Sequence, residues 1–177
     1  MSGDTLDVTT DARTDFWRHT HYGFVRDSGH LFGLDTAGDF TAEVRIQARF
    51  TTLYDQAGLM VRLAEDQWLK AGIEYADGTM LLSSVLTLGT SDWATAAWRG
   101  DAADFYLRLT VARGVLRLQA STDGKHWPLV RLCSFPVASR YLVGPMCCTP
   151  ERAGLQARFT QFVTSPPLDR DLHDLSV

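Results

Sequence analysis

The chain has 177 residues and a net charge of −4, with 17 basic against 21 acidic side chains. This length fits one domain, and contents of 45% hydrophobic and 21% charged residues are typical of a globular protein that buries a core without disulfides or metals. The acidic balance, the lack of a basic run and the lack of an apolar span of about 18 residues exclude nucleic acid and membranes as expected partners.

The N-terminal residues are polar and lack the apolar run of a signal peptide, so we expect no export. The three cysteines are Cys133, Cys147 and Cys148. The adjacent pair would point to opposite faces of a strand, so they are poor mutual partners. Together these features predict a reduced, cytoplasmic protein.

In chain order, the first expected strand covers residues 16–26. Residues 40–50 follow, with apolar side chains at every even position and Glu43, Arg45, Gln47 and Arg49 between them. This period of two is the pattern of a half-buried strand.

Residues 54–75, YDQAGLMVRLAEDQWLKAGIEY, predict a hairpin whose odd positions are apolar. Opposing residues must share parity for these side chains to meet, and a three-residue loop at 64–66 achieves this. Four pairs then share the other face, namely Gln56 with Glu74, Gly58 with Gly72, Met60 with Lys70, and Arg62 with Trp68. The facing glycines either leave a bare groove for a ligand or permit strong twist and close packing.

A two-residue turn at Asp77-Gly78 leads to a strand at 80–88. It brings Ser83 opposite Gly72 and adds Val85 and Thr87 to the polar face. The loop that follows carries Trp93, either as a lid over this face or as a plug at the sheet edge.

Residues 105–111 and 116–120 alternate in the same way and predict a hairpin turning at Arg113-Gly114. Further strands are expected near 127–134, 141–148 and 154–163. Many short strands without a long amphipathic helix predict an all-β, antiparallel β-sandwich or jelly roll. We expect one domain over 1–165 and a tail at 166–177, either solvated or strapped over a sheet.

The chain also resembles the family named for regulation of enolase, long labelled a domain of unknown function. The matching segments are TDFWRHTHYGF at 14–24, YDQAGLMVR at 54–62, WLKAGIEY at 68–75, SDW at 91–93, STDGKHW at 121–127 and VGPMCCTP at 143–150. The resemblance implies a concanavalin A-like jelly roll without a settled activity. Looser similarity extends to non-catalytic accessory domains of some β-xylosidases.

The sequence lacks the residue patterns expected of a catalytic site or a metal site. A glucanase of this fold needs paired carboxylates, commonly Glu-x-Asp-x-x-Glu, and none of the four glutamates lies in that pattern. His19 and His21 form an H-x-H on one expected strand face but lack a third ligand. We therefore predict no metal and no cofactor, and favour a protein that is not an enzyme.

The polar face mixes carboxylate, ammonium, guanidinium, amide, hydroxyl and indole groups, which suits a hydroxylated or anionic small molecule. We predict a binding module for a sugar or sugar phosphate on the concave face of a sheet. The alternatives are a protein-interaction or metabolic regulatory module, and a sugar-modifying enzyme using Lys70 and Glu74 as acid and base. The expected ligand-binding residues are Trp17, His21, Gln56, Arg62, Trp68, Lys70, Glu74, Ser83 and Trp93.

Overall fold

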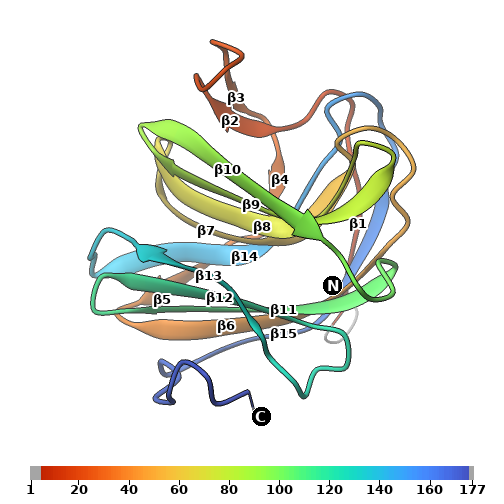
Figure 1. The fold of residues 1–177 in the computed structure, drawn as a ribbon. Helices are drawn as coiled ribbons and strands as arrows, with labels where there is room; N and C mark the ends of the chain where they lie inside the picture. Colours follow the sequence, from red (N-terminus) through yellow and green to blue (C-terminus); the bar gives the residue numbers. More distant parts are fainter. Residues whose placement is uncertain (1–4, 176–177) are drawn as a thin grey trace.

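The computed structural model describes residues 5–175, and every regular element in that range is a β-strand. Two antiparallel sheets lie face to face (Figure 1). One sheet has the order β1 (Thr5–Thr9), β15 (Gln156–Ser165), β6 (Phe40–Ala48), β11 (Asp104–Ala112), β12 (Val115–Ser121) and β13 (Leu129–Ser134). The other has the order β10 (Thr90–Ala97), β9 (Thr79–Leu88), β8 (Gln67–Ala76), β7 (Gln56–Ala64), β14 (Arg140–Cys148) and β4 (His30–Leu31), with β5 (Leu34–Ala37) also pairing with β14. The fold is the predicted concanavalin A-like β-sandwich, and the strands expected from alternation at 40–50, 80–88, 127–134, 141–148 and 154–163 are present.

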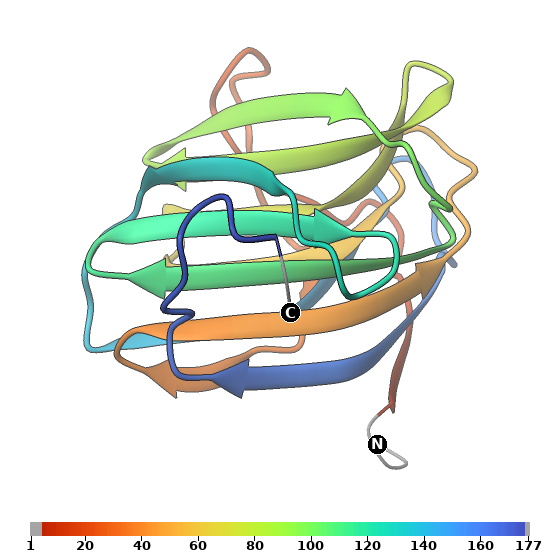
Figure 2. The ribbon, with the colours of Figure 1, turned by 60° about the horizontal axis from the view of Figure 1, so that its bottom comes forward.

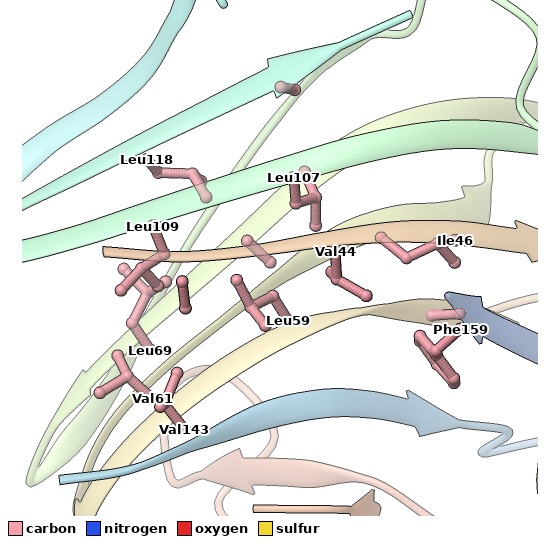
Figure 3. Close-up of a cluster of buried hydrophobic side chains, with 14 of the residues drawn as sticks. Val44, Ile46, Leu59, Val61, Leu69, Leu107, Leu109, Leu118, Val143 and Phe159 are labelled. Atoms are coloured by element: carbon pink, nitrogen blue, oxygen red, sulfur yellow. The ribbon is translucent and has the colours of Figure 1, made fainter. Parts of the chain in front are cut away.

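The core lies between the inner faces of the two sheets (Figure 3). Alternation brings every second side chain of each strand into this layer, because successive residues of a strand point to opposite faces. Its fully buried members include Val44, Ile46, Leu59, Val61, Leu69, Leu107, Leu109, Leu118, Val143 and Phe159. Their burial supplies the main apolar driving force for folding.

The predicted registers are confirmed for β7–β8, β8–β9 and β11–β12. Asp77-Gly78 and Arg113-Gly114 are two-residue turns in which both residues have positive φ. The β7–β8 connection differs from the expected three-residue loop. Ala64 pairs with Gln67 across the two-residue turn Glu65-Asp66, and a bulge at Leu63 restores the parity that the core needs.

The prediction of one strand over residues 16–26 is wrong. The segment is a small hairpin of β2 (Phe16–Arg18) and β3 (Val25–Asp27), which forms a sheet of its own. Its loop contains His19, His21 and Gly23, all with positive φ. The left-handed conformation at these residues breaks the extended chain and turns it back on itself.

The β2–β3 hairpin covers the outer face of the seven-stranded sheet, at the top of Figure 1. Beneath it lies a second, smaller core made of Phe16, Trp17, Met60, Trp68, Val85, Met146 and Cys148. The polar face of the 54–75 hairpin is therefore enclosed. A cover supplied by a distant segment explains why apolar side chains occur on both faces of β7 and β8.

The chain after β15 runs back across the outer face of the six-stranded sheet (Figure 2). The amide of Leu168 donates to Thr41 Oγ1 at 2.9 Å, and Arg117 Nη2 donates to the carbonyl of Arg170 at 3.1 Å. These contacts make the tail a strap. No helix in residues 5–175 is long and apolar enough to cross a membrane.

Candidate ligand-binding site

A cavity of about 160 Å³ lies between the β2–β3 hairpin and the outer face of the seven-stranded sheet. Aromatic side chains form much of its wall, and ionisable and amide groups line its polar part. The aromatic residues are Trp17, Tyr22, Phe24, Tyr54 and Trp93; the polar ones are Asp15, Gln56, Lys70, Glu74 and Glu151; Val85 and Pro150 complete the lining. An apolar and aromatic wall combined with polar groups at fixed positions is the usual make-up of a small-molecule site.

Lys70 occupies the polar end of this cavity. It lies in the middle of β8, 4% exposed, on the face that alternation directs toward the hairpin. Its Nζ donates to Oδ1 of Asp15 at 2.8 Å, and Asp15 is the residue that precedes β2. Burial alone would lower the pKa of Lys70, but the carboxylates of Asp15 and Glu74 outweigh it and the pKa is raised, so the ammonium stays charged.

Glu74 lies four residues further along β8, on the same face as Lys70, and pairs with Gln56 on the neighbouring strand β7. Burial raises the pKa of its carboxyl, and the charge of Lys70 with hydrogen bonds to Ser83 and Trp93 offsets only part of that rise. Ser83 is held in turn by Trp93, whose Nε1 donates to its Oγ at 2.9 Å. Ser83 on β9 thus contacts both the indole of Trp93 on β10 and the carboxyl of Glu74 on β8.

Hydrogen bonds also fix the aromatic wall. Trp17 Nε1 donates to the carbonyl of Thr20 at 2.9 Å, and the rings of Trp17 and Trp93 meet edge to face with centroids 6.2 Å apart. The hydroxyls of Tyr22 and Tyr54 lie 3.3 Å apart. This hydrogen bond, with burial, raises the pKa of Tyr54 to about 12. The hairpin and the sheet therefore share the wall of the cavity.

The paired glycines serve close packing of the strands. A Cβ on Gly58 would overlap the carbonyl oxygen of Ala71, and one on Gly72 would overlap that of Ala57. Of the two interpretations of this pair, the structure supports close approach of backbone. A small void of about 10 Å³ remains beside Gly72, bounded by Lys70, Glu74 and Ser83 among others, which is room for about one water.

Five of the nine residues expected to bind a ligand line the cavity, namely Trp17, Gln56, Lys70, Glu74 and Trp93. Ser83 borders the small void and supports Trp93. The structure places the other three elsewhere. Arg62 forms two hydrogen bonds with Asp27, Trp68 is fully buried with its Nε1 bonded to the Glu65 carbonyl, and His21 is exposed in the hairpin loop.

His19 and His21 were expected on one face of a strand, but both lie in the loop of the hairpin. His21 packs its ring against Tyr22 with centroids 4.8 Å apart. Within residues 5–175, no group of three or more His, Cys, Asp or Glu side chains is arranged to hold a metal ion. The two histidines therefore lie in the hairpin loop outside the cavity, whereas the adjacent Tyr22 lines it.

Sequence reasoning missed six residues of the cavity lining: Asp15, Tyr22, Phe24, Tyr54, Pro150 and Glu151. All six lie outside strands β7–β9, whereas Val85 was placed on the polar face but not among the expected ligand-binding residues. A signal was available, because Asp15, Tyr22, Phe24, Tyr54 and Pro150 all fall within the segments quoted above for the family resemblance.

The sandwich and its covered outer face define a concanavalin A-like β-sandwich protein with one aromatic-walled cavity under the hairpin. The chain belongs to the family described as "Protein of unknown function (DUF1349)", which matches residues 1–167. It is 59% identical over 169 residues to "Regulation of enolase protein 1" of Saccharomyces cerevisiae, covering 96% of this chain and 85% of that protein.

Solved structures agree with this assignment. A functionally unknown protein from Saccharomyces cerevisiae is similar with a TM-score of 0.94 and 56% identity, over 95% of this chain and 91% of that one. A bifunctional GH43-CE protein of Bacteroides eggerthii matches with a TM-score of 0.73 and 14% identity, over 94% of this chain and 22% of its own length. The GH43B protein of a xyloglucan locus of Bacteroides ovatus matches at 0.68 and 15%, over 90% and 32%. These two share the fold alone.

Proposed function

We propose that the protein is a non-catalytic binding module, acting inside the cell, for a small sugar-like molecule held in the cavity between the hairpin and the sheet. The observation that carries the proposal is the placement of Lys70, Glu74 and Gln56 in the same cavity as the rings of Trp17 and Trp93. Sugars present hydroxyls along their edges and apolar CH groups on their faces, so they need both kinds of surface.

The volume of the cavity favours a ligand of about one sugar ring. Pockets that enclose drug-sized ligands measure roughly 300–1,000 Å³, whereas this one is about 160 Å³. A ligand of that size would touch the hairpin and the sheet at once.

Titration calorimetry with neutral monosaccharides and disaccharides tests the proposal. Trp93→Phe removes the indole N–H that holds Ser83, and we expect it to weaken binding at least about tenfold. Trp98→Phe is the matched control, because Trp98 packs against Phe105 outside the cavity. Absence of binding by every sugar, or equal loss in both variants, would contradict the proposal.

A second candidate is regulation through contact with another protein, which the name of the yeast relative suggests for that protein. Strand β10 favours it, because it is an edge of the seven-stranded sheet and exposes Ala94, Ala96 and Ala97 beside Trp93. Binding to purified enolase, measured by interferometry, tests this candidate. Ala96→Lys should abolish it, whereas Ala37→Lys on the exposed strand β5 should not; no binding by the wild-type protein would rule it out.

A further inference from the structure

We infer that the ligand of this cavity is uncharged, and that the site discriminates against phosphorylated and carboxylated sugars. The inference rests on the proposed function and narrows it to a neutral polyhydroxylated ring. It replaces the broader expectation from sequence, which included sugar phosphates because Arg62 and Lys70 were both taken to face the ligand.

Arg62 does not serve the cavity. Its Nη1 and Nη2 donate to Asp27 Oδ1 and Oδ2 at 2.5 and 2.8 Å. This two-point contact matches the planar fork of the guanidinium to the carboxylate and uses two of its five N–H donors. Arg62 is also absent from the lining, so it offers no charge to a phosphate.

Lys70 is the one cation among the described residues that line the cavity, and its charge is already balanced. The 2.8 Å contact with Asp15 is made by side chains only 5% and 16% exposed. A phosphate that took over Lys70 would leave the Asp15 carboxylate without its partner. Uncovering a poorly solvated charge in this way is strongly unfavourable.

The remaining ionisable groups of the lining are carboxyls. Glu74 lies at the buried end and Glu151 at the exposed side, and neither has an ion-pair partner within 4 Å in the described structure. Burial raises the pKa of the Glu74 carboxyl, and the adjacent Lys70–Asp15 ion pair has no net charge of its own. An anionic ligand would therefore meet three carboxyls and a single neutralised ammonium.

The hydrogen-bonding capacity that remains suits hydroxyl groups. Lys70 carries three N–H donors, of which the described contacts use one for Asp15. Gln56 Nε2 donates to the carbonyl of Tyr54 at 3.2 Å, which leaves its Oε1 free to accept from a ligand hydroxyl. The Glu74 carboxyl can accept a hydrogen bond from a ligand hydroxyl in either protonation state. Neutral hydroxyls can satisfy each of these groups without changing the charge of the site.

Calorimetry on the full chain with matched ligand sets tests the inference: a neutral hexose, its 6-phosphate, its uronic acid and its 2-amino derivative, and the same for a pentose where available. We expect the neutral sugar to bind at least about tenfold more tightly than its charged counterparts. Equal or tighter binding of a phosphate, acid or amine would overturn the inference and leave the proposed function standing. Failure of every ligand to bind would overturn the proposed function and the inference with it.

Two further measurements sharpen the result. The affinity for the neutral sugar should change less than about twofold across a salt series, because no net charge is neutralised on binding; a steep salt dependence would overturn the inference. Asp15→Asn frees the charge of Lys70 and should shift selectivity toward the phosphate by about tenfold or more. Circular dichroism checks that this variant is folded, and unchanged selectivity in a folded variant would contradict the role assigned to Asp15.

Discussion

Lys70 and Asp15 are 55 positions apart in the chain, yet their side chains meet at 2.8 Å in the polar part of the cavity. The contact joins the middle of β8 to the segment that begins the β2–β3 hairpin. A buried ion pair is seldom more stabilising than apolar side chains of the same size, because both ions lose their hydration. Its presence is better explained by the cavity, where it supplies polar groups without net charge.

Removing the acidic partner of this pair should cost more stability than removing the basic partner. We expect Asp15→Ala to lower the free energy of unfolding by about 3–5 kcal/mol, because the buried ammonium of Lys70 is left uncompensated. Lys70→Met should cost less, since Asp15 is nearer to solvent. Urea denaturation measures both, and the double variant should be more stable than Asp15→Ala alone; equal costs would contradict this account.

The carboxyl of Glu74 should make stability depend on pH. Its folded pKa is raised above the ordinary value of 4.5, chiefly by burial. Between 4.5 and the raised value the folded chain keeps a proton that the unfolded chain has released, so the free energy of unfolding falls as pH rises through this window. Glu74→Gln lacks this fall. Denaturation curves from about pH 4 to about pH 8 measure the free energy of unfolding of both proteins. The value for the variant should rise relative to that of the wild type as pH rises, and the difference should then become constant. A difference that is the same at every pH would count against a raised pKa.

The strands and their registers could be predicted from the sequence because both depend on short-range information. Alternation specifies which residues share a face, and a turn such as Asp77-Gly78 fixes the offset between neighbouring strands. The bulge at Leu63 escaped prediction because a two-residue turn with one extra residue gives the same parity as a three-residue loop.

The cavity could be predicted only in part, because half of it is built by contacts between distant segments. The β2 and β3 strands have three residues each, too short to show a period. Nothing near Lys70 in the chain identifies Asp15 as its partner, and nothing near Arg62 identifies Asp27. The polar side chains of β7 and β8 were therefore recognised as a group, while the hairpin that separates Arg62 from Lys70 was not.

The contrast between two glycines tests the role of close backbone packing. Gly72→Ala places a methyl group on the carbonyl of Ala57, so the strands must separate, and we expect a loss of roughly 3 kcal/mol or more. Gly78→Ala, in a turn with a φ of 74° and open space around the Cβ, should cost only about 1 kcal/mol. Denaturation curves of both variants check the order, and a Gly72→Ala variant as stable as Gly78→Ala would show that the strand pair can relax.

An ion pair attaches the β2–β3 hairpin to the seven-stranded sheet. Arg62 and Asp27 hold β3 to β7, and their side chains are 19% and 32% exposed. Arg62→Met should therefore lower global stability by only about 1 kcal/mol or less. Its larger effect should be local, because β2 and β3 pair only with each other in a two-stranded sheet and open with fewer broken backbone hydrogen bonds than the main sheets. Hydrogen exchange should accelerate at the paired residues 16–18 and 25–27 and stay unchanged in β11 and β12.

Arg140→Met, which removes an exposed pair with Asp35 on β5, is the matched control and should leave exchange in the hairpin unaltered. Equal acceleration in both variants would mean that the Arg62–Asp27 pair does not hold the hairpin over the cavity.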